Sequence, residues 1–232
     1  MRLIDDLEIF VRRANRTVQC EHTFTLKKLP YVCEFNSWGF RDQEFDAFAG
    51  KSVNICLGDS FVVNQGDVVE NAWPQQLNQR TQLPTLNLGL DGAGNDTIKL
   101  IYDRACKIFN VENVFVMYSF FHRRLEDNIL TQCDVEDFDF DSNIAHFKKN
   151  FIPDAHYTFN PEWCWNDEEA DFIRKYYHKH LPKCYTHWHA TGHAKKKPRI
   201  EQLDSELFNA DGMHMSKERN SKIADYFEQF IL

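Results

Sequence analysis

Short apolar runs alternate with helical periods through the middle of the chain. The runs at 52–57 (SVNICL), 84–90 and 113–120 (NVFVMYSF) each fit a buried strand. Apolar residues recur with helical spacing over 68–80 and 95–109. Strands that alternate with helices predict an α/β fold in which a central parallel sheet is built by right-handed crossovers.

The pattern weakens on both sides of this region. Residues 1–50 lack a clear period, and we expect them to form an irregular extension that packs on the core. After residue 121 the rhythm blurs, and the acidic, aromatic stretch over about 125–200 is interpreted as an insertion. The weaker elements expected in these parts are helices at 3–13, 167–181 and 216–231 and extended segments at 19–26 and 199–203.

Composition suits one domain. The 232 residues are 43% hydrophobic and 14% aromatic, which is enough to fill a single core formed by residues 51–232. The net charge of -8 argues against a nucleic-acid partner, because nucleic-acid binding needs a basic face. The basic run at 195–199 is the local exception, and we interpret it as a solvated loop.

Cysteine usage and the N-terminal sequence bear on the cellular compartment. The seven cysteines are scattered and form no CxxC pair, which is typical of reduced thiols. The N-terminal segment lacks the apolar run of a signal peptide, and nothing approaches the roughly 20 apolar residues of a membrane span. We therefore expect a cytoplasmic protein with no membrane span, and leave open whether it acts in a cell or in a virus particle.

Four polar segments fall where ligands bind in parallel sheets. Three follow predicted strands: Gly58-Asp59-Ser60, the loop 89–94, and the segment around His122. The fourth is the segment 211–214, just before the last helix. Because ligands bind outside the carboxyl ends of the strands, we expect these segments to converge.

The residue types in these segments suit nucleophilic catalysis. The hydroxyl of Ser60 needs a base, and a histidine such as His214 titrates near neutrality. Asp211 lies three residues before His214, so one turn can present both side chains on the same side. The N–H groups of Ser60 and Gly92 are candidate oxyanion donors. The competing interpretations are an ordinary turn at Ser60, a helix cap at Asp211 and a turn glycine at Gly92.

The segments also resemble a known family. The blocks 58–61 (GDSF), 66–68 and 73–77 are similar to the first block of the SGNH, or GDSL-type, hydrolases. The segment 87–92 resembles the family's glycine block, and 211–214 its Asp-x-x-His block. The resemblance implies a flavodoxin-like three-layer α/β/α fold, no cofactor or metal, and hydrolysis of an acyl or acetyl ester of a carbohydrate or small molecule. By position it gives the nucleophile's role to Ser60, an oxyanion role to Gly92, and the rest of the triad to Asp211 and His214.

One block departs from the family pattern. The resemblance leads us to expect Gly-x-Asn-Asp after the third strand, with the Asn as an oxyanion donor, but the chain runs through 118–124 (YSFFHRR). His122 and Arg123 are the candidates to donate instead, and a cation there would suit an anionic substrate. The departure keeps two alternatives open, a catalytically weakened carbohydrate-binding or structural protein and an acyltransferase. A phosphate-accepting domain that uses Asp59 is disfavoured, because it leaves 211–214 without a purpose.

Two further clusters lie in the insertion. The run Cys184, His187, His189 and His193 has zinc-ligand residue types, but its spacing matches no closed structural site, so a His-rich surface loop is favoured. Three tryptophans, at 163, 165 and 188, fit either a sugar-stacking wall or a cap on the core.

Overall fold

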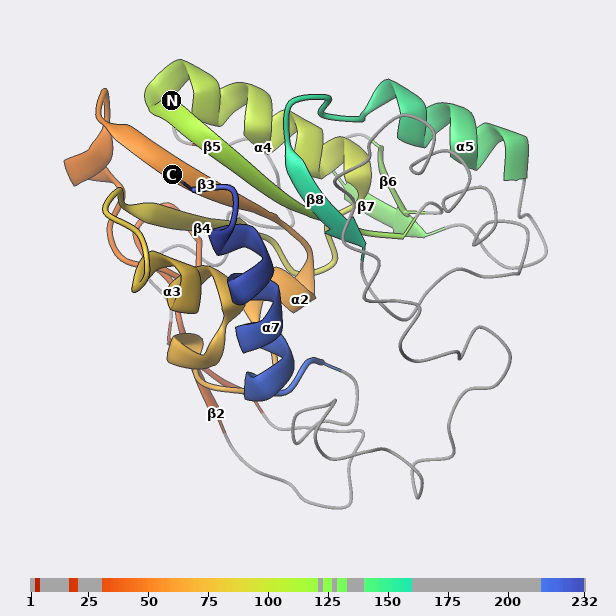
Figure 1. The fold of residues 1–232 in the computed structure, drawn as a ribbon. Helices are drawn as coiled ribbons and strands as arrows, with labels where there is room; N and C mark the ends of the chain where they lie inside the picture. Colours follow the sequence, from red (N-terminus) through yellow and green to blue (C-terminus); the bar gives the residue numbers. More distant parts are fainter. Residues whose placement is uncertain are drawn as a thin grey trace.

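The protein is built around one parallel sheet (Figure 1). The computed structural model describes residues 3–4, 17–20, 31–120, 123–126, 129–132, 140–159 and 214–231. The strands of the central sheet, in spatial order, are β4 (Thr85–Gly89), β3 (Ser52–Gly58), β5 (Asn110–Tyr118) and β8 (His156–Phe159). Two antiparallel pairs stand apart from this sheet: β1 (Thr17–Cys20) with β2 (Tyr31–Glu34), and β6 (Arg123–Glu126) with β7 (Ile129–Gln132).

Helices cover both faces of the sheet (Figure 1). The helices of one face are α4 (Asn95–Ile108) and α5 (Phe140–Lys149). Those of the other face are α2 (Ser60–Val63), α3 (Trp73–Asn78) and α7 (Lys217–Glu228). Two short 3-10 turns, η1 (Asp46–Phe48) and η2 (Val69–Asn71), lie in the connections. The predicted three-layer α/β arrangement is confirmed.

The strands of the central sheet are apolar on both faces, because an apolar cluster packs on each face. Ile55 and Leu57 of β3 belong to the cluster that contains Ile98 of α4. Cys56, between them, belongs to the opposite cluster with Phe115 and Phe227 of α7, whose ring centroids lie 5.0 Å apart. Alternate side chains of a strand point to opposite faces, so the run SVNICL reads as continuously apolar because both faces are covered.

The strand order places a switch point beside β3. The chain crosses from β3 to β4 on one side and then returns to β5 on the other side of β3. This is the 2-1-3-4 order of flavodoxin-like sheets, in which ligands bind where the winding direction reverses. The carboxyl ends of β3 and β5 therefore mark the expected position of a site.

The structure corrects the sequence prediction in two places. The helix expected over 68–80 is divided into η2 and α3, because Ala72 has an extended backbone (φ -61°, ψ 139°) and Pro74 lies in the first turn of α3. Helix α5 and strand β8 were missed, because both lie within the stretch interpreted as an insertion. Strand β8 nevertheless belongs to the central sheet, where it pairs with β5. Strand β8 has only four residues, too few to show a period.

Several expected elements lie outside the described residues: the helix at 167–181, the strand at 199–203 and most of the helix at 3–13. Within the residues that the structure describes, no helix has the length and apolar character needed to cross a membrane.

Candidate active site

The turn after β3 presents Ser60 at the start of helix α2. Asp59 is the N-cap residue of this helix, and its Oδ1 accepts a hydrogen bond from the N–H of Phe61 at 3.1 Å. Gly58 must lack a side chain, because a Cβ there would lie 2.3 Å from Cγ2 of Val62 and 2.7 Å from the carbonyl oxygen of Met117. Close packing before Ser60 and a buried cap beside it hold this turn in one conformation.

His214 lies against the same turn. Its ring packs on Phe61, the residue after Ser60, with 4.8 Å between the ring centroids. Both His214 and Ser60 are buried, at 5% and 7% exposure. Among the described residues no hydrogen bond joins the Ser60 hydroxyl to the imidazole. Asp211, the predicted partner of His214, lies outside the described residues.

Asn220 connects the helix that follows His214 to the helix that carries Ser60. It is fully buried, and its amide nitrogen donates to Oδ1 of Asn64 at 3.1 Å. Its Oδ1 accepts from the N–H of Trp73 at 3.1 Å. Asn64 ends α2 in the left-handed conformation (φ 58°), which asparagine tolerates. The segments around Ser60 and His214, distant in the sequence, are therefore joined by buried hydrogen bonds.

Arg41 fixes the far side of the serine helix. Its Nη1 donates to the carbonyl oxygens of Asn64 at 2.7 Å and Val63 at 3.2 Å, and its Nη2 donates to that of Asp67 at 2.8 Å. Arg41 is 3% exposed, so these bonds are shielded from water. The sequence predicted none of the contacts of Arg41 or Asn220, because the partners of a buried polar side chain are brought together only by the fold.

The second loop lies beside the serine turn. The N–H of Leu90 donates to the carbonyl oxygen of Gly58 at 2.9 Å, and the N–H of Ala93 donates to that of Leu90 at 3.0 Å. Gly92 has φ 76°, which favours glycine. Within the described part of the chain, neither the Gly92 N–H nor the Ser60 N–H donates a hydrogen bond.

Asn87 braces helix α2 against strand β4. Its amide nitrogen donates to the carbonyl oxygen of Val62 at 3.0 Å, and its Oδ1 accepts from the N–H of Gly89 at 3.0 Å. The N–H of Asn87 donates to Oδ2 of Asp42 at 2.6 Å. Burial raises the pKa of Asp42 to about 6, although this bond and those from Gln43 and Gln75 favour the carboxylate.

The third loop holds the other oxygen of Asp59. The hydroxyl of Ser119 donates to Oδ2 of Asp59 at 2.7 Å, and Nη1 of Arg123 donates to the same oxygen at 3.2 Å. Asn95 fixes the backbone of Ser119: its Oδ1 accepts from the Ser119 N–H at 2.9 Å, and its amide nitrogen donates to the Ser119 carbonyl oxygen at 3.0 Å. A serine and an arginine that follow β5 therefore hold the residue before Ser60.

The ion pair between Arg123 and Asp59 is buried. The side chain of Asp59 is fully buried, and that of Arg123 is 12% exposed. Burial lowers the pKa of Arg123, and the carboxylates of Asp59 and Asp91 oppose this effect. Of the two alternatives to the missing Asn, Arg123 lies in this loop, while His122 falls outside the described residues.

Metal-binding residues do not cluster in the described part of the chain, where no group of three or more His, Cys, Asp or Glu side chains could hold an ion. The Cys/His run at 184–193 and the three tryptophans of the insertion lie outside the described residues.

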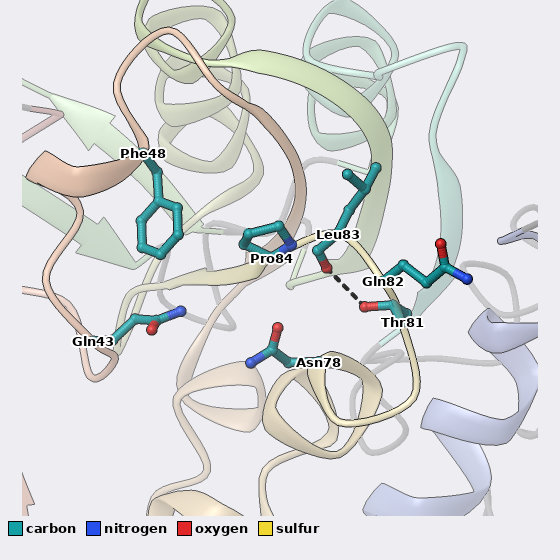
Figure 2. Close-up of a pocket in the computed structure, with 7 residues that line it drawn as sticks. All are labelled: Gln43, Phe48, Asn78, Thr81, Gln82, Leu83 and Pro84. Carbon is teal, nitrogen blue, oxygen red and sulfur yellow. Dashed lines mark hydrogen bonds between the residues drawn. The ribbon is translucent and has the colours of Figure 1, made fainter.

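An open surface pocket lies away from this site (Figure 2). Pro84, one of its lining residues, directly precedes β4, whereas the candidate site lies at the carboxyl end of that strand. The residues that line it are Gln43, Phe48, Asn78, Thr81, Gln82, Leu83 and Pro84. None of these side chains ionises, so the pocket offers no group for acid or base catalysis.

Comparison with known proteins gives structural matches alone. No family model matches the sequence, and no curated protein sequence matches it. The fold is similar to a member of the lipolytic protein G-D-S-L family from Veillonella parvula (11% identity, TM-score 0.47, 78% of this chain and 97% of that one). It is also similar to a psychrotrophic esterase from Pseudoalteromonas sp. (11% identity, TM-score 0.46, 78% and 95%). A third match is a family two carbohydrate esterase from Clostridium thermocellum (15% identity, TM-score 0.42, 79% and 64%).

These neighbours include the G-D-S-L group that the sequence motifs resemble. At such low identities and TM-scores, what they act on says nothing of the substrate of this chain. The functional argument therefore depends on the residues of the site.

Proposed function

We propose that this chain is a serine carboxylester hydrolase in which Ser60 is the nucleophile and His214 the general base. The supporting observation is the packing of His214 on Phe61, 4.8 Å between ring centroids, beside the turn that carries Ser60. The buried bond from Asn220 to Asn64 ties the two segments together. Asp211 is the proposed partner that orients the imidazole, as in a Ser-His-Asp triad.

The proposed reaction has two halves. The Ser60 hydroxyl attacks the ester carbonyl while His214 takes its proton, and a tetrahedral oxyanion forms. The N–H groups of Ser60 and Gly92 donate to this oxyanion, with Arg123 or His122 as a further donor. The intermediate collapses, the alcohol leaves with the proton from His214, and Ser60 carries the acyl group. Water then attacks this acyl-enzyme, with His214 again as the base, and the acid is released.

The substrate that we propose is an acyl or acetyl ester of a carbohydrate or another small molecule. The resemblance of the Ser60 block and of 211–214 to the SGNH hydrolases supports this substrate class. Neither proposed step requires a cofactor or a metal.

Replacement of the nucleophile tests the proposal. Ser60→Ala is expected to lower the release of nitrophenol from 4-nitrophenyl acetate by at least about 10³-fold, with an unchanged circular dichroism spectrum. The matched control is Ser52→Ala at the other end of β3, where the exposed hydroxyl bonds Glu112. This control is expected to keep full activity. Equal activity of the wild type and Ser60→Ala would contradict the proposal.

One observation favours a second candidate function. Ser119 and Arg123 occupy the loop in which the family's Asn is expected, and both bind Asp59. A site that lost its third oxyanion donor would bind carbohydrate without hydrolysing it. A fluorophosphonate probe separates the two functions, because only an activated serine is labelled. Labelling of the wild type but not of Ser60→Ala supports the hydrolase, and its absence in both supports the binding protein.

A further inference from the structure

The guanidinium of Arg123 donates hydrogen bonds to the described residues through Nη1, but not through the edge formed by Nε and Nη2. Nη1 donates to Oδ2 of Asp59 and to the hydroxyl of Ser119, each at 3.2 Å. Nε is buried and has no hydrogen-bond partner. Nη2 also donates to none of the described residues. Nε and Nη2 lie on the same edge of the planar group, so their N–H bonds form an unoccupied fork.

The orientation of this fork is set by its surroundings. The Arg123 guanidinium stacks on the ring of Phe120, with 4.0 Å from Cζ to the ring centroid. Asp59 and Ser119 hold the Nη1 side of the same plane. Little rotational freedom remains to be lost when a ligand binds the open edge, which favours binding. A buried N–H without an acceptor is also costly, so a ligand that supplies one is stabilised.

The fork belongs to the candidate active site. Asp59, which holds it, directly precedes Ser60. The Arg123 backbone lies against the second loop, because a Cβ on Gly94 would be 2.9 Å from the Arg123 carbonyl oxygen. Asp91, in that loop, is close enough to act on the charge of Arg123. Arg123 therefore lies where the second and third loops meet, beside the residue that precedes Ser60.

We propose that the Nε–Nη2 edge of Arg123 binds a carboxylate of the substrate, so that the preferred substrate is an ester that carries a negative charge near the scissile bond. This inference rests on the proposed function, because it names the substrate class of the same site. Two parallel N–H groups match the two oxygens of a carboxylate. The two carboxylates near Arg123, Asp59 and Asp91, repel each further negative charge on a ligand, so a singly charged carboxylate suits the site better than a dianionic phosphate.

Two esters with the same leaving group test the preference. Mono-4-nitrophenyl succinate and 4-nitrophenyl butyrate share the nitrophenol and a four-carbon acyl chain, but only the first carries a carboxylate. The wild type is expected to prefer the succinate ester in kcat/KM. Arg123→Gln is expected to reduce that preference by about 10–100-fold, mainly through KM. Equal losses of kcat on both esters would overturn the inference, because they identify Arg123 as an oxyanion donor instead.

Further variants separate binding from structure. Arg123→Lys keeps a positive charge beside Asp59 without the fork, and it is expected to fold and to lose most of the preference. The matched control is Arg124→Gln, because the Arg124 guanidinium donates to the Arg123 carbonyl oxygen at 3.0 Å and to Asn143, and to neither Asp59 nor Ser119. This control removes an arginine from the same hairpin and is expected to keep the preference. An equal loss in Arg124→Gln would overturn the inference.

A binding experiment without catalysis distinguishes this inference from the proposed function. Titration calorimetry of Ser60→Ala with monomethyl succinate, which carries one carboxylate, is expected to show saturable binding, which disappears in Ser60→Ala/Arg123→Gln. Inorganic phosphate is expected to bind more weakly. Failure of monomethyl succinate to bind Ser60→Ala, or tighter binding of phosphate, would overturn the carboxylate site even if the wild type hydrolyses nitrophenyl esters. Saturable binding of monomethyl succinate to Ser60→Ala with no hydrolysis by the wild type would sustain the carboxylate site and overturn only the hydrolase.

Discussion

The carboxyl ends of β3 and β5 lie side by side in the sheet but are built by different means. At the end of β3 the bond that shapes the serine turn is local: Asp59 caps the helix that Ser60 begins, and its partner Phe61 is two residues away. At the end of β5 the contacts are distant in sequence: Asn95 holds Ser119 from 24 residues away. Arg123 reaches Asp59 across 64 residues.

The carboxylate of Asp59 connects the ends of the two strands. Oδ1 of Asp59 serves the local cap and Oδ2 serves the third loop. The position of the serine turn therefore depends on Ser119 and Arg123, which both donate to Asp59 from beyond the end of β5.

Removal of the shared carboxylate is expected to have the largest effect. Asp59→Ala leaves Arg123 buried without its ion-pair partner and removes the cap of α2. We expect the free energy of unfolding to fall by about 3–5 kcal/mol, measured by urea denaturation. In Asp59→Ala/Arg123→Ala no buried charge remains unpaired, so the double variant is expected to be less destabilised than the sum of the single variants. Additive effects would show that the two strand ends are independent.

A variant of Asn220 tests the contacts that hold helix α2, which carries Ser60. Asn220→Ala leaves the N–H of Trp73 buried without an acceptor and removes the bond to Asn64. A loss of about 2–3 kcal/mol in the free energy of unfolding is expected. A fall in kcat/KM for 4-nitrophenyl acetate is also expected, because His214 precedes this helix.

The neighbouring residue supplies the control for Asn220. Ser221→Ala removes a half-buried hydroxyl that accepts from Nη2 of Arg80 at 3.1 Å. It is expected to change stability by less than about 0.5 kcal/mol. If Asn220→Ala were no more harmful than this control, the buried bond from Asn220 to Asn64 would not hold the two segments together.

The same contrast explains how much could be predicted from the sequence. The end of β3 was predictable, because its apolar run and the Gly58-Asp59-Ser60 turn are local signals. The contacts of Asn95 and Asn220 were not, because a buried asparagine looks like any other polar residue until the fold brings its partners together. Strand β8 was missed for a related reason: its four residues pair with β5 only after the chain has passed through α5.

A variant of Asp96 tests the contact that holds the β6–β7 hairpin, and it is expected to change stability least. Its Oδ2 accepts from the N–H of Leu125 at 2.7 Å and lies 3.2 Å from Nε2 of His146. Burial opposes ionisation of Asp96, but hydrogen bonds from His146, Leu125 and Thr97 outweigh it and lower its pKa below 3.8. A lowered folded-state pKa means that the stabilisation is complete above the unfolded value near 3.8 and is lost as the pH falls through the folded value.

Asp96→Asn is therefore expected to cost about 1 kcal/mol of unfolding free energy at pH 7, a difference that shrinks below about pH 4 as the carboxylate is protonated. Hydrogen exchange at the Leu125 amide should become faster in this variant, because its acceptor is weakened. The control on the same helix is Asp103→Asn, whose half-exposed carboxylate pairs with Lys99 and is expected to contribute less than about 0.5 kcal/mol. A difference between Asp96→Asn and the wild type that does not shrink below about pH 4 would show that Asp96 does not anchor the hairpin as a carboxylate. The position of the Arg123 side chain would then depend on Asp59, Ser119 and Phe120.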